Sequence, residues 1–205
     1  MNTRAVPQVA VIDAGGANLG SVRYALERLG ARPVFARDAD ELVGADRIVL
    51  PGVGAAAPAM KLLRTRGLDA ALRTTAVPVL GICLGMQLLY QGSEEGDTAC
   101  LGVLPGRIRR LRKVQGRRLP HMGWNTLRTL VDRNPLLEGI VDGDAAYFVH
   151  GYAASVDGSA LATTSHGEAF SAVVQCGPYC GMQFHPERSA AVGAALLRNF
   201  LRWSP

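Results

Sequence analysis

The feature that most constrains this fold is a repeated pairing of a short apolar run with a helical pattern. Residues 9–13, 33–36, 47–50 and 77–82 are apolar runs with the length of buried strands. Helical spacing follows the first run, an alanine-rich helical stretch follows the third, and residues 84–90 resemble a helix start. Strands that alternate with helices predict a parallel sheet with right-handed crossovers, whose sites lie at the carboxyl ends of the strands.

The second half of the chain is richer in strand patterns. Candidate strands are residues 106–111, 123–127, 145–150, 161–164, 172–176 and 179–184, and an amphipathic helix is expected over residues 190–203. These strands predict antiparallel additions to the sheet. No internal repeat or long linker divides the chain, so residues 1–205 are expected to form one α/β domain with helices on both faces of a central, mostly parallel sheet.

Composition excludes several classes of protein. Hydrophobic residues make up 48% of the 205 residues, which suits a compact domain and argues against disorder. No apolar run approaches the roughly 18 residues that span a membrane, and the first residues lack the pattern of a signal peptide, so a cytoplasmic protein without a membrane partner is expected. The four cysteines are too few for a disulfide scaffold and are expected to be reduced thiols.

The sharpest local signal surrounds Cys83. Gly81 and Gly85 flank this cysteine at the end of an apolar run, and small residues there permit a tight turn from strand to helix that exposes a nucleophile. The helix start would favour the reactive thiolate, and the amide of Leu84 would point toward a developing oxyanion. A buried structural cysteine is the commoner role for a cysteine taken at random, but the flanking glycines favour the nucleophile.

A candidate base lies near the end of the sequence. His185 and Glu187 flank Pro186, and proline disfavours a helix, so we expect residues 183–187 to be extended. Alternate residues of an extended chain face the same way, which would place the carboxylate beside the imidazole. A carboxylate fixes the tautomer and charge of a histidine base, but this pattern is weak unless a nucleophile lies nearby.

These segments resemble the class I, triad-type glutamine amidotransferases. Residues 81–87 are similar to the nucleophile segment of that family, residues 183–187 to its histidine–glutamate segment, and the order Cys83, His185, Glu187 agrees. The resemblance implies the class I amidotransferase fold and hydrolysis of glutamine through a γ-glutamyl thioester, without a cofactor or metal. It also implies oxyanion amides at Val53 and Leu84, with a peptide near Gly52 able to turn. The implied glutamine pocket comprises Gly54, Gln87, Gly151 and Tyr152, although relatives commonly carry Ser or Thr at the position of Gly151.

Four further segments narrow the resemblance to the branch of this family that pairs with a cyclase in histidine biosynthesis. They are residues 13–19, 51–54, 120–125 and 147–152. The implied partner is a cyclase subunit with a (β/α)₈ barrel, which joins this chain in a heterodimer and receives ammonia. The implied contact residues are Asn18, Met122, Trp124, Asn125, Tyr147 and Arg188. Core packing is an equally good interpretation of Trp124 and Tyr147.

Other functions remain open. A stand-alone cysteine hydrolase of the same fold, such as a γ-glutamyl hydrolase, would share the triad, as would the amidotransferase subunit of another pathway. A binding module without activity is disfavoured by the intact triad. Cys176 and Cys180 lack a second Cys/His pair, so no metal site is expected. The basic residues 107–118 lack interleaved aromatics, so a solvated hairpin with a turn at Gln115 and Gly116 is expected rather than a nucleic-acid site.

Overall fold

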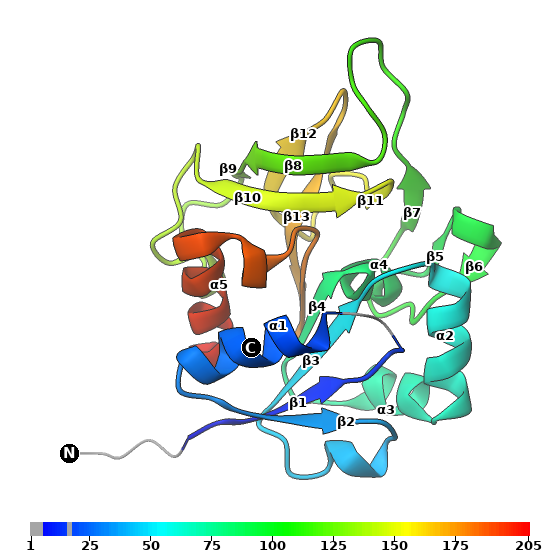
Figure 1. Ribbon diagram of the computed structural model, residues 1–205, viewed down its shortest axis with the longest axis vertical. Helices are drawn as coiled ribbons and strands as arrows, with labels where there is room; N and C mark the ends of the chain where they lie inside the picture. The colour runs from blue at the N-terminus through cyan, green and yellow to red at the C-terminus, as the bar shows by residue number, and fades with distance from the viewer. Residues whose placement is uncertain (1–5, 16–17) are drawn as a thin grey trace.

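A computed structural model describes residues 6–15 and 18–205, so residues 16 and 17 of the segment 13–19 lie outside the described part. The central sheet has the strand order β2-β1-β3-β4-β14-β13-β12-β9 (Figure 1). The strands are β1 (Gln8–Ile12), β2 (Arg32–Ala36), β3 (Arg47–Gly52), β4 (Val79–Cys83), β9 (Arg128–Thr129), β12 (Ala160–Ser165), β13 (Ala169–Cys176) and β14 (Tyr179–Met182).

The parallel half of the sheet is confirmed. β1 pairs in parallel with both β2 and β3, and β4 pairs in parallel with β3 and β14. The helices of this half are α1 (Leu19–Arg28), α2 (Ala56–Thr65), α3 (Leu68–Thr74) and α4 (Leu84–Leu89). β1, β3 and β4 are almost entirely buried, which explains why they read as continuous apolar runs rather than alternating ones.

The antiparallel additions are also confirmed, but only part of them joins the central sheet. β13 pairs antiparallel with β14 and β12, and β12 pairs with β9. The other strands form two separate small sheets. One joins β8 (His121–Thr126) to β10 (Ala145–His150). The second has the order β11-β7-β5-β6 and consists of β5 (Gly92–Ser93), β6 (Thr98–Ala99), β7 (Arg107–Arg110) and β11 (Tyr152–Ala154).

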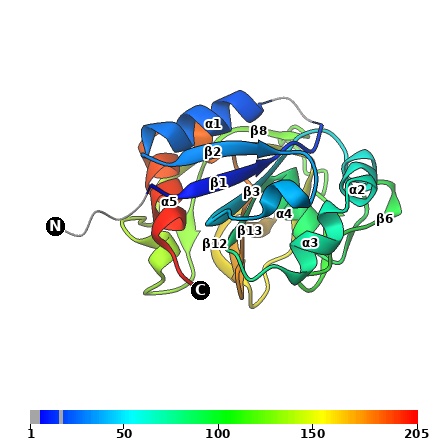
Figure 2. The same cartoon turned by 90° about the horizontal axis from the view of Figure 1, so that it is seen from below.

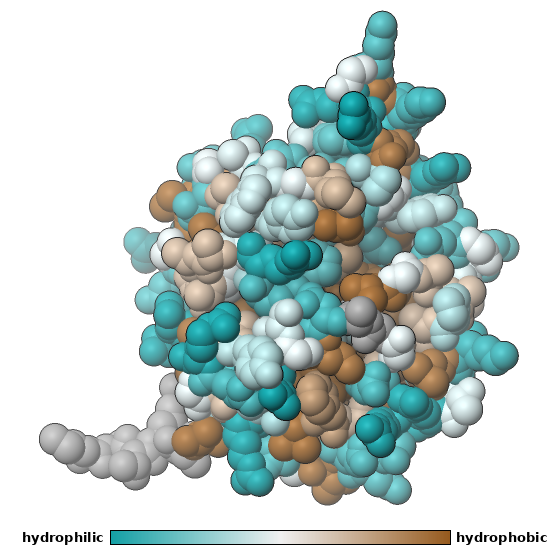
Figure 3. Space-filling view, viewed as in Figure 1, coloured by the Kyte–Doolittle hydropathy of each residue, from teal (hydrophilic) through white to brown (hydrophobic). Residues whose placement is uncertain are grey.

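The expected basic hairpin is wrong. β7 ends at Arg110 and pairs with β11 and β5, whereas the next strand, β8, pairs with β10. The turn at Gln115 and Gly116 is present, and Gly116 has the positive φ of 78° that such a turn requires. The two arms therefore make no ladder with each other, and the loop between β7 and β8 projects from the body as the hydrophilic tip at the top of Figure 3.

Helices cover both faces of the central sheet. α1 and the closing helix α5 (Ala190–Arg202) pack on one face, where Leu26, Leu196 and Phe200 are fully buried. α2, α3 and α4 pack on the other, where Met60, Leu68 and Leu88 are fully buried (Figure 2). Short 3-10 helices lie at Asp40–Leu42, Glu95–Asp97, Pro135–Leu137 and Pro186–Arg188. Within residues 6–15 and 18–205, no helix has the length and apolar character to cross a membrane.

Candidate active site

Cys83 occupies a strained turn between β4 and α4. Its φ of 54° and ψ of −110° are rare for a residue with a side chain, and such strain concentrates at functional positions. The flanking glycines make the turn possible. A Cβ on Gly85 would lie 1.7 Å from the carbonyl oxygen of Leu50, and one on Gly81 would lie 2.6 Å from the amide nitrogen of Met86. The sequence therefore needs glycine at both positions for steric reasons.

His185 meets Glu187, although by a different geometry from the one expected. The backbone is extended at His185, but Pro186 begins a 3-10 helix, Pro186–Arg188, so the extended prediction for residues 183–187 is wrong at its end. Proline fits the first position of a helical turn because its missing N–H would have no partner there. The Nδ1 of His185 donates to Oε1 of Glu187 over 2.9 Å.

The carboxylate of Glu187 is held from a second side. Nδ2 of Asn18, the residue before α1, donates to the same Oε1 over 2.5 Å. The Glu187 side chain has no exposed surface, and its Oε2 has no hydrogen-bond partner among the described residues. A buried carboxylate that accepts two hydrogen bonds at one oxygen is fixed in position and can orient the imidazole.

The charge state of His185 follows from these contacts. Burial lowers its pKa, but the hydrogen bonds and charges of Cys83 and Glu187 outweigh burial and raise the pKa from 6.5 to about 10. The imidazole is therefore protonated at neutral pH and lies against the sulfur atom. A cationic histidine is the partner that a reactive thiolate needs.

A cavity of about 320 Å³ opens over this group. Its lining comes from the loop after β3, the turn at Cys83, the 3-10 helix Glu95–Asp97, and strands β10 and β11. The lining residues are Val53, Gly54, Cys83, Leu84, Gln87, Glu95, Pro120, Val149, His150, Gly151, Tyr152 and His185. The structure thus brings residues from both halves of the chain to one cavity of the size of a small polar metabolite.

The loop after β3 lies beside the nucleophile. Gly52 pairs with Cys83 across β3 and β4, and a Cβ on Gly52 would lie 2.9 Å from the amide nitrogen of Gly85. Val53 is 37% exposed, and Gly54 has a φ of 91° with open space around it. Val53, Cys83 and Leu84 thus line the same cavity, and the open space around Gly54 leaves room for the loop to turn.

The far wall of the cavity is a polar network. Nε2 of Gln87 donates to the carbonyl oxygen of Tyr152 over 2.8 Å and to Oε1 of Gln183 over 3.1 Å. Among the described residues, Glu95 contributes the one carboxylate of the cavity lining. Glu95 and Gln183 were not among the residues identified from sequence. Gln183 was within the recognised segment 183–187, whereas no sequence pattern marks Glu95 as a pocket residue.

Comparison with known proteins identifies the family. Residues 10–203 match the model of the family described as glutamine amidotransferase class-I. The chain belongs to the class-I glutamine amidotransferases. Among curated relatives, the imidazole glycerol phosphate synthase subunit HisH of Xanthomonas axonopodis pv. citri (strain 306) is 59% identical over 196 residues, which are 96% of this chain and 98% of the relative. The HisH subunit of Xylella fastidiosa (strain Temecula1 / ATCC 700964) is 57% identical over 194 residues, which are 95% and 96% of the two chains.

Solved structures agree on the amidotransferase fold. A structure described as a glutamine amidotransferase has a TM-score of 0.74 at 23% identity, with 95% of this chain and 97% of that chain covered. The structure of PurLQS from Thermotoga maritima has a TM-score of 0.72 at 21% identity, with 96% and 98% covered. The expected single-domain class I amidotransferase fold is therefore confirmed.

A second group of histidines lies behind the cavity of this amidotransferase. Nδ1 of His150 donates to the carbonyl oxygen of Tyr152 over 2.8 Å, so its Nε2 accepts from Nδ1 of His121 over 3.1 Å. Nδ2 of Asn125 then donates to Nε2 of His121 over 3.2 Å. Burial lowers the pKa of His121 to about 4 and that of His150 to about 3. These histidines are neutral at pH 7, in contrast to His185.

The residues expected at a partner interface divide into two groups. Met122 and Trp124 on β8 are 65% and 57% exposed, and the Trp124 ring packs edge-on against Tyr147 of β10 at 5.9 Å. The guanidinium of Arg188 lies 5.4 Å above the Tyr147 ring. These four side chains form one surface. The side-chain amides of Asn18 and Asn125 are instead bonded to Glu187 and to the carbonyl oxygen of Ser165, respectively.

Strand β10 connects that surface to the catalytic group. The N–H of His185 donates to the carbonyl oxygen of Tyr147 over 2.9 Å, and Sγ of Cys83 lies 3.6 Å from the carbonyl oxygen of Val149. The main chain of one strand therefore contacts both the base and the nucleophile, and the same strand carries the half-buried Tyr147 ring that packs against the exposed Trp124.

Proposed function

We propose that this amidotransferase is the glutaminase subunit of an imidazole glycerol phosphate synthase. It hydrolyses glutamine to glutamate and passes ammonia to a cyclase subunit with a (β/α)₈ barrel in histidine biosynthesis. The identity of 57–59% to HisH subunits over nearly the whole chain supports the pathway. The contact of Cys83, His185 and Glu187 at the edge of one cavity carries the chemistry. A cytoplasmic location, where thiols stay reduced, agrees with the free cysteines of the described chain.

The geometry supports a two-step hydrolysis. The Cys83 thiolate adds to the side-chain amide carbon of glutamine, His185 gives its proton to the leaving nitrogen, and ammonia departs from a γ-glutamyl thioester. His185, now neutral, takes a proton from water as the water attacks the thioester, and glutamate leaves with the thiolate restored. Glu187 fixes the tautomer and stabilises the charged imidazole throughout. In this proposal the amides of Val53 and Leu84 bind the oxyanion once the peptide near Gly52 turns inward.

The cavity lining suits the polar ends of glutamine. We infer that Glu95, as the carboxylate of the lining, pairs with the α-ammonium group. Gln87 holds the main chain at Tyr152, so the strand ends around Gly54, Gly151 and Tyr152 can receive the α-carboxylate or the amide through main-chain groups. Gly151 contributes no side-chain contact, which places more of the recognition on the backbone.

The surface of Met122, Trp124, Tyr147 and Arg188 is the proposed docking face for the cyclase. Exposed aromatic, methionine and arginine side chains are the types enriched at the centre of protein interfaces. The side-chain amides of Asn18 and Asn125 donate to Glu187 and Ser165 within the chain, so they are not included in this face. The basic loop between β7 and β8 can steer the partner or its phosphorylated substrate.

The test is reconstitution. The chain is mixed with a cyclase subunit, and glutamate release is measured with and without the cyclase nucleotide ligand. Strong stimulation by the complex supports the proposal, whereas full turnover by the lone chain supports a stand-alone hydrolase. Cys83→Ala should abolish synthesis from glutamine but spare synthesis from free ammonium. Loss of both activities would make Cys83 a structural residue.

A further inference from the structure

Glu95 supplies the hydrogen-bond acceptor at the start of α2. Its Oε2 accepts from the N–H of Ala56, the first residue of that helix, over 2.8 Å. The residue before the helix, Ala55, has no side-chain oxygen and makes no capping bond. The first N–H groups of a helix need acceptors, and a carboxylate also complements the positive end of the helix. A residue 39 positions further along the chain therefore performs the capping role.

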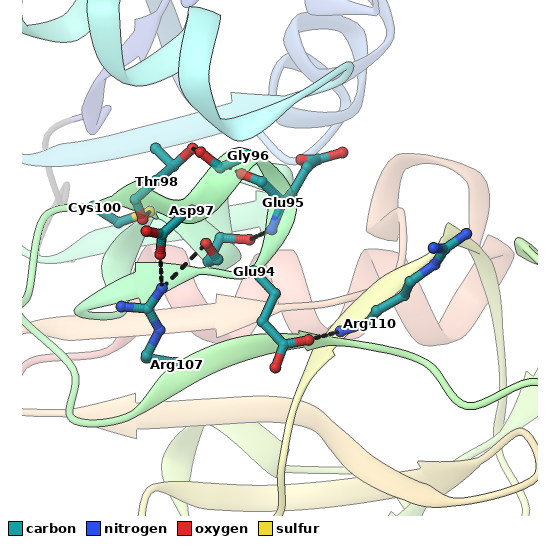
Figure 4. Close-up of polar contacts among 9 residues, drawn as sticks. Glu94, Glu95, Gly96, Asp97, Thr98, Cys100, Arg107 and Arg110 are labelled. Carbon is teal, nitrogen blue, oxygen red and sulfur yellow. Dashed lines mark hydrogen bonds and ion pairs between the residues drawn. The ribbon is translucent and has the colours of Figure 1, made fainter.

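The turn that carries Glu95 is held rigidly. The carboxylate of Glu94 accepts from the main-chain N–H at the end of β7 over 2.9 Å, and Arg107 pairs with Asp97 over 2.7 Å (Figure 4). The hydroxyl of Thr98 donates to the carbonyl oxygen of Glu95 over 2.7 Å. Figure 4 shows the Glu95 side chain pointing away from the Arg107–Asp97 pair. The main chain at Glu95 is thus fixed by contacts within its own turn and with β7, and the carboxylate extends from it to α2.

The helix start is also one end of the oxyanion loop. At the other end, Gly52 packs against the turn at Cys83 so closely that a Cβ would clash with the amide of Gly85. Between Gly52 and Ala56 lie Val53, which is 37% exposed, and Gly54, which has open space around it. The loop is therefore fixed at Gly52 and at Ala56, with room to turn between them. Glu95 fixes the end at Ala56.

We propose that Glu95 is a positioning residue for the oxyanion loop, which acts through the N–H of Ala56. This inference rests on the proposed function, since it concerns the loop that presents the Val53 amide. Glu95 also lines the cavity, so the same residue that caps α2 through Oε2 is the one inferred to pair with the ammonium group of glutamine. Arrival of the substrate and the setting of the loop then depend on one side chain.

The experiment separates this role from ammonium binding by steady-state kinetics of glutamate release in the complex with the cyclase and its nucleotide ligand. In Glu95→Gln the amide oxygen still accepts from Ala56 but the charge is lost, so KM rises and kcat is retained. Glu95→Ala loses both roles, and kcat falls roughly five- to tenfold as well, as expected for a lost helix cap of about 1 kcal/mol. Glu168→Gln is the matched control, because that carboxylate also accepts from a main-chain N–H, that of Arg112, and lies outside the catalytic cavity.

A second variant removes the hydrogen bond between Ala56 and Glu95 by changing the donor instead of the acceptor. Ala56→Pro deletes the N–H at a helix position where proline is well tolerated, and leaves Glu95 in place. We expect kcat to fall roughly five- to tenfold, as estimated for Glu95→Ala, with KM for glutamine nearly unchanged. Thermal unfolding identifies any variant that fails to fold. If Ala56→Pro does not fold, the kcat of Glu95→Ala alone tests the inference. Normal kcat in the folded variants would overturn this inference while leaving the proposed function intact. An unaltered complex without glutaminase activity would remove the proposed function, and this inference with it.

Discussion

Replacing Glu187 by glutamine tests whether the carboxylate sets the charge of the base. Glutamine keeps an oxygen that can accept from His185 and Asn18, but it removes the negative charge. A hydrogen bond to a charged group contributes about 1.5–3 kcal/mol, and one pKa unit corresponds to about 1.4 kcal/mol. We therefore expect the pKa of His185 to fall by about one to two units from its value of about 10.

The assay is an NMR titration of the histidine ring signals between pH 3 and about 11. The chain has four histidines, and the lowered pKa values of His121 and His150 leave the signal with an alkaline midpoint for His185. The control is Glu27→Gln, which removes the same charge from an exposed pair with Arg23 and should shift the midpoint by less than about 0.2 units. A midpoint in Glu187→Gln within that margin of the unaltered protein would refute the reasoning.

The same shift has a consequence for stability. The folded-state pKa of His185 is raised from 6.5 to about 10, so the stabilisation is fully present below pH 6.5 and is lost as pH rises through about 10. In Glu187→Gln the loss should again begin near pH 6.5 but should end at a lower pH, so that less stability is lost in total. Urea unfolding at pH 7 and pH 9 measures the difference, and equal losses in the two proteins would contradict the assignment of the charge to Glu187.

Three further outcomes are expected. Gly85→Ala should lose about 3 kcal/mol or more in urea unfolding because the new Cβ meets a backbone carbonyl at 1.7 Å, whereas Gly158→Ala, with open space, should change stability by less than about 0.5 kcal/mol. Gly151→Ser should fold normally, since the nearest atom to a Cβ at position 151 lies at 3.9 Å. Steady-state kinetics should show an equal or lower KM for glutamine. A several-fold higher KM would contradict a pocket that is open at this position. Because the pKa values of His121 and His150 are lowered in the folded state, the unfolded state binds more protons below pH 6.5. The free energy of unfolding should therefore fall by about 1.4 kcal/mol per pH unit for each histidine between pH 6.5 and about 4. Urea unfolding midpoints that stay constant from pH 7 to pH 5 would contradict this.

The sequence predicted well where steric demands are local. The apolar runs that became β1, β3 and β4 are buried on both faces, so their composition alone identified them. Gly81 and Gly85 indicated a tight turn because a side chain at either position would collide with the main chain. The meeting of His185 with Glu187 was also predicted, but Pro186 produces it through a 3-10 turn rather than through alternation in a strand.

The sequence failed where a structure depends on distant partners. The basic residues 107–118 carry a good turn signal, but strand pairing is chosen by β11 and β10, which lie far along the chain. Glu95 lies in a turn rich in charged residues, where its composition predicts solvent exposure. Only the folded chain shows that its carboxylate reaches α2 and the cavity.

Strand β10 links binding at the surface to the state of the catalytic thiol. The carbonyl oxygen of Tyr147 accepts from the N–H of His185 while its half-buried ring packs against the exposed Trp124, and the carbonyl oxygen of Val149 lies 3.6 Å from the sulfur of Cys83. Free energies of coupling act equally in both directions. If a partner protein binds the outer side of this strand more tightly in one state of the thiol, its binding must stabilise that state by the same free energy. A glutamine analogue attached to Cys83 should therefore alter the affinity for whatever partner docks there, without touching it.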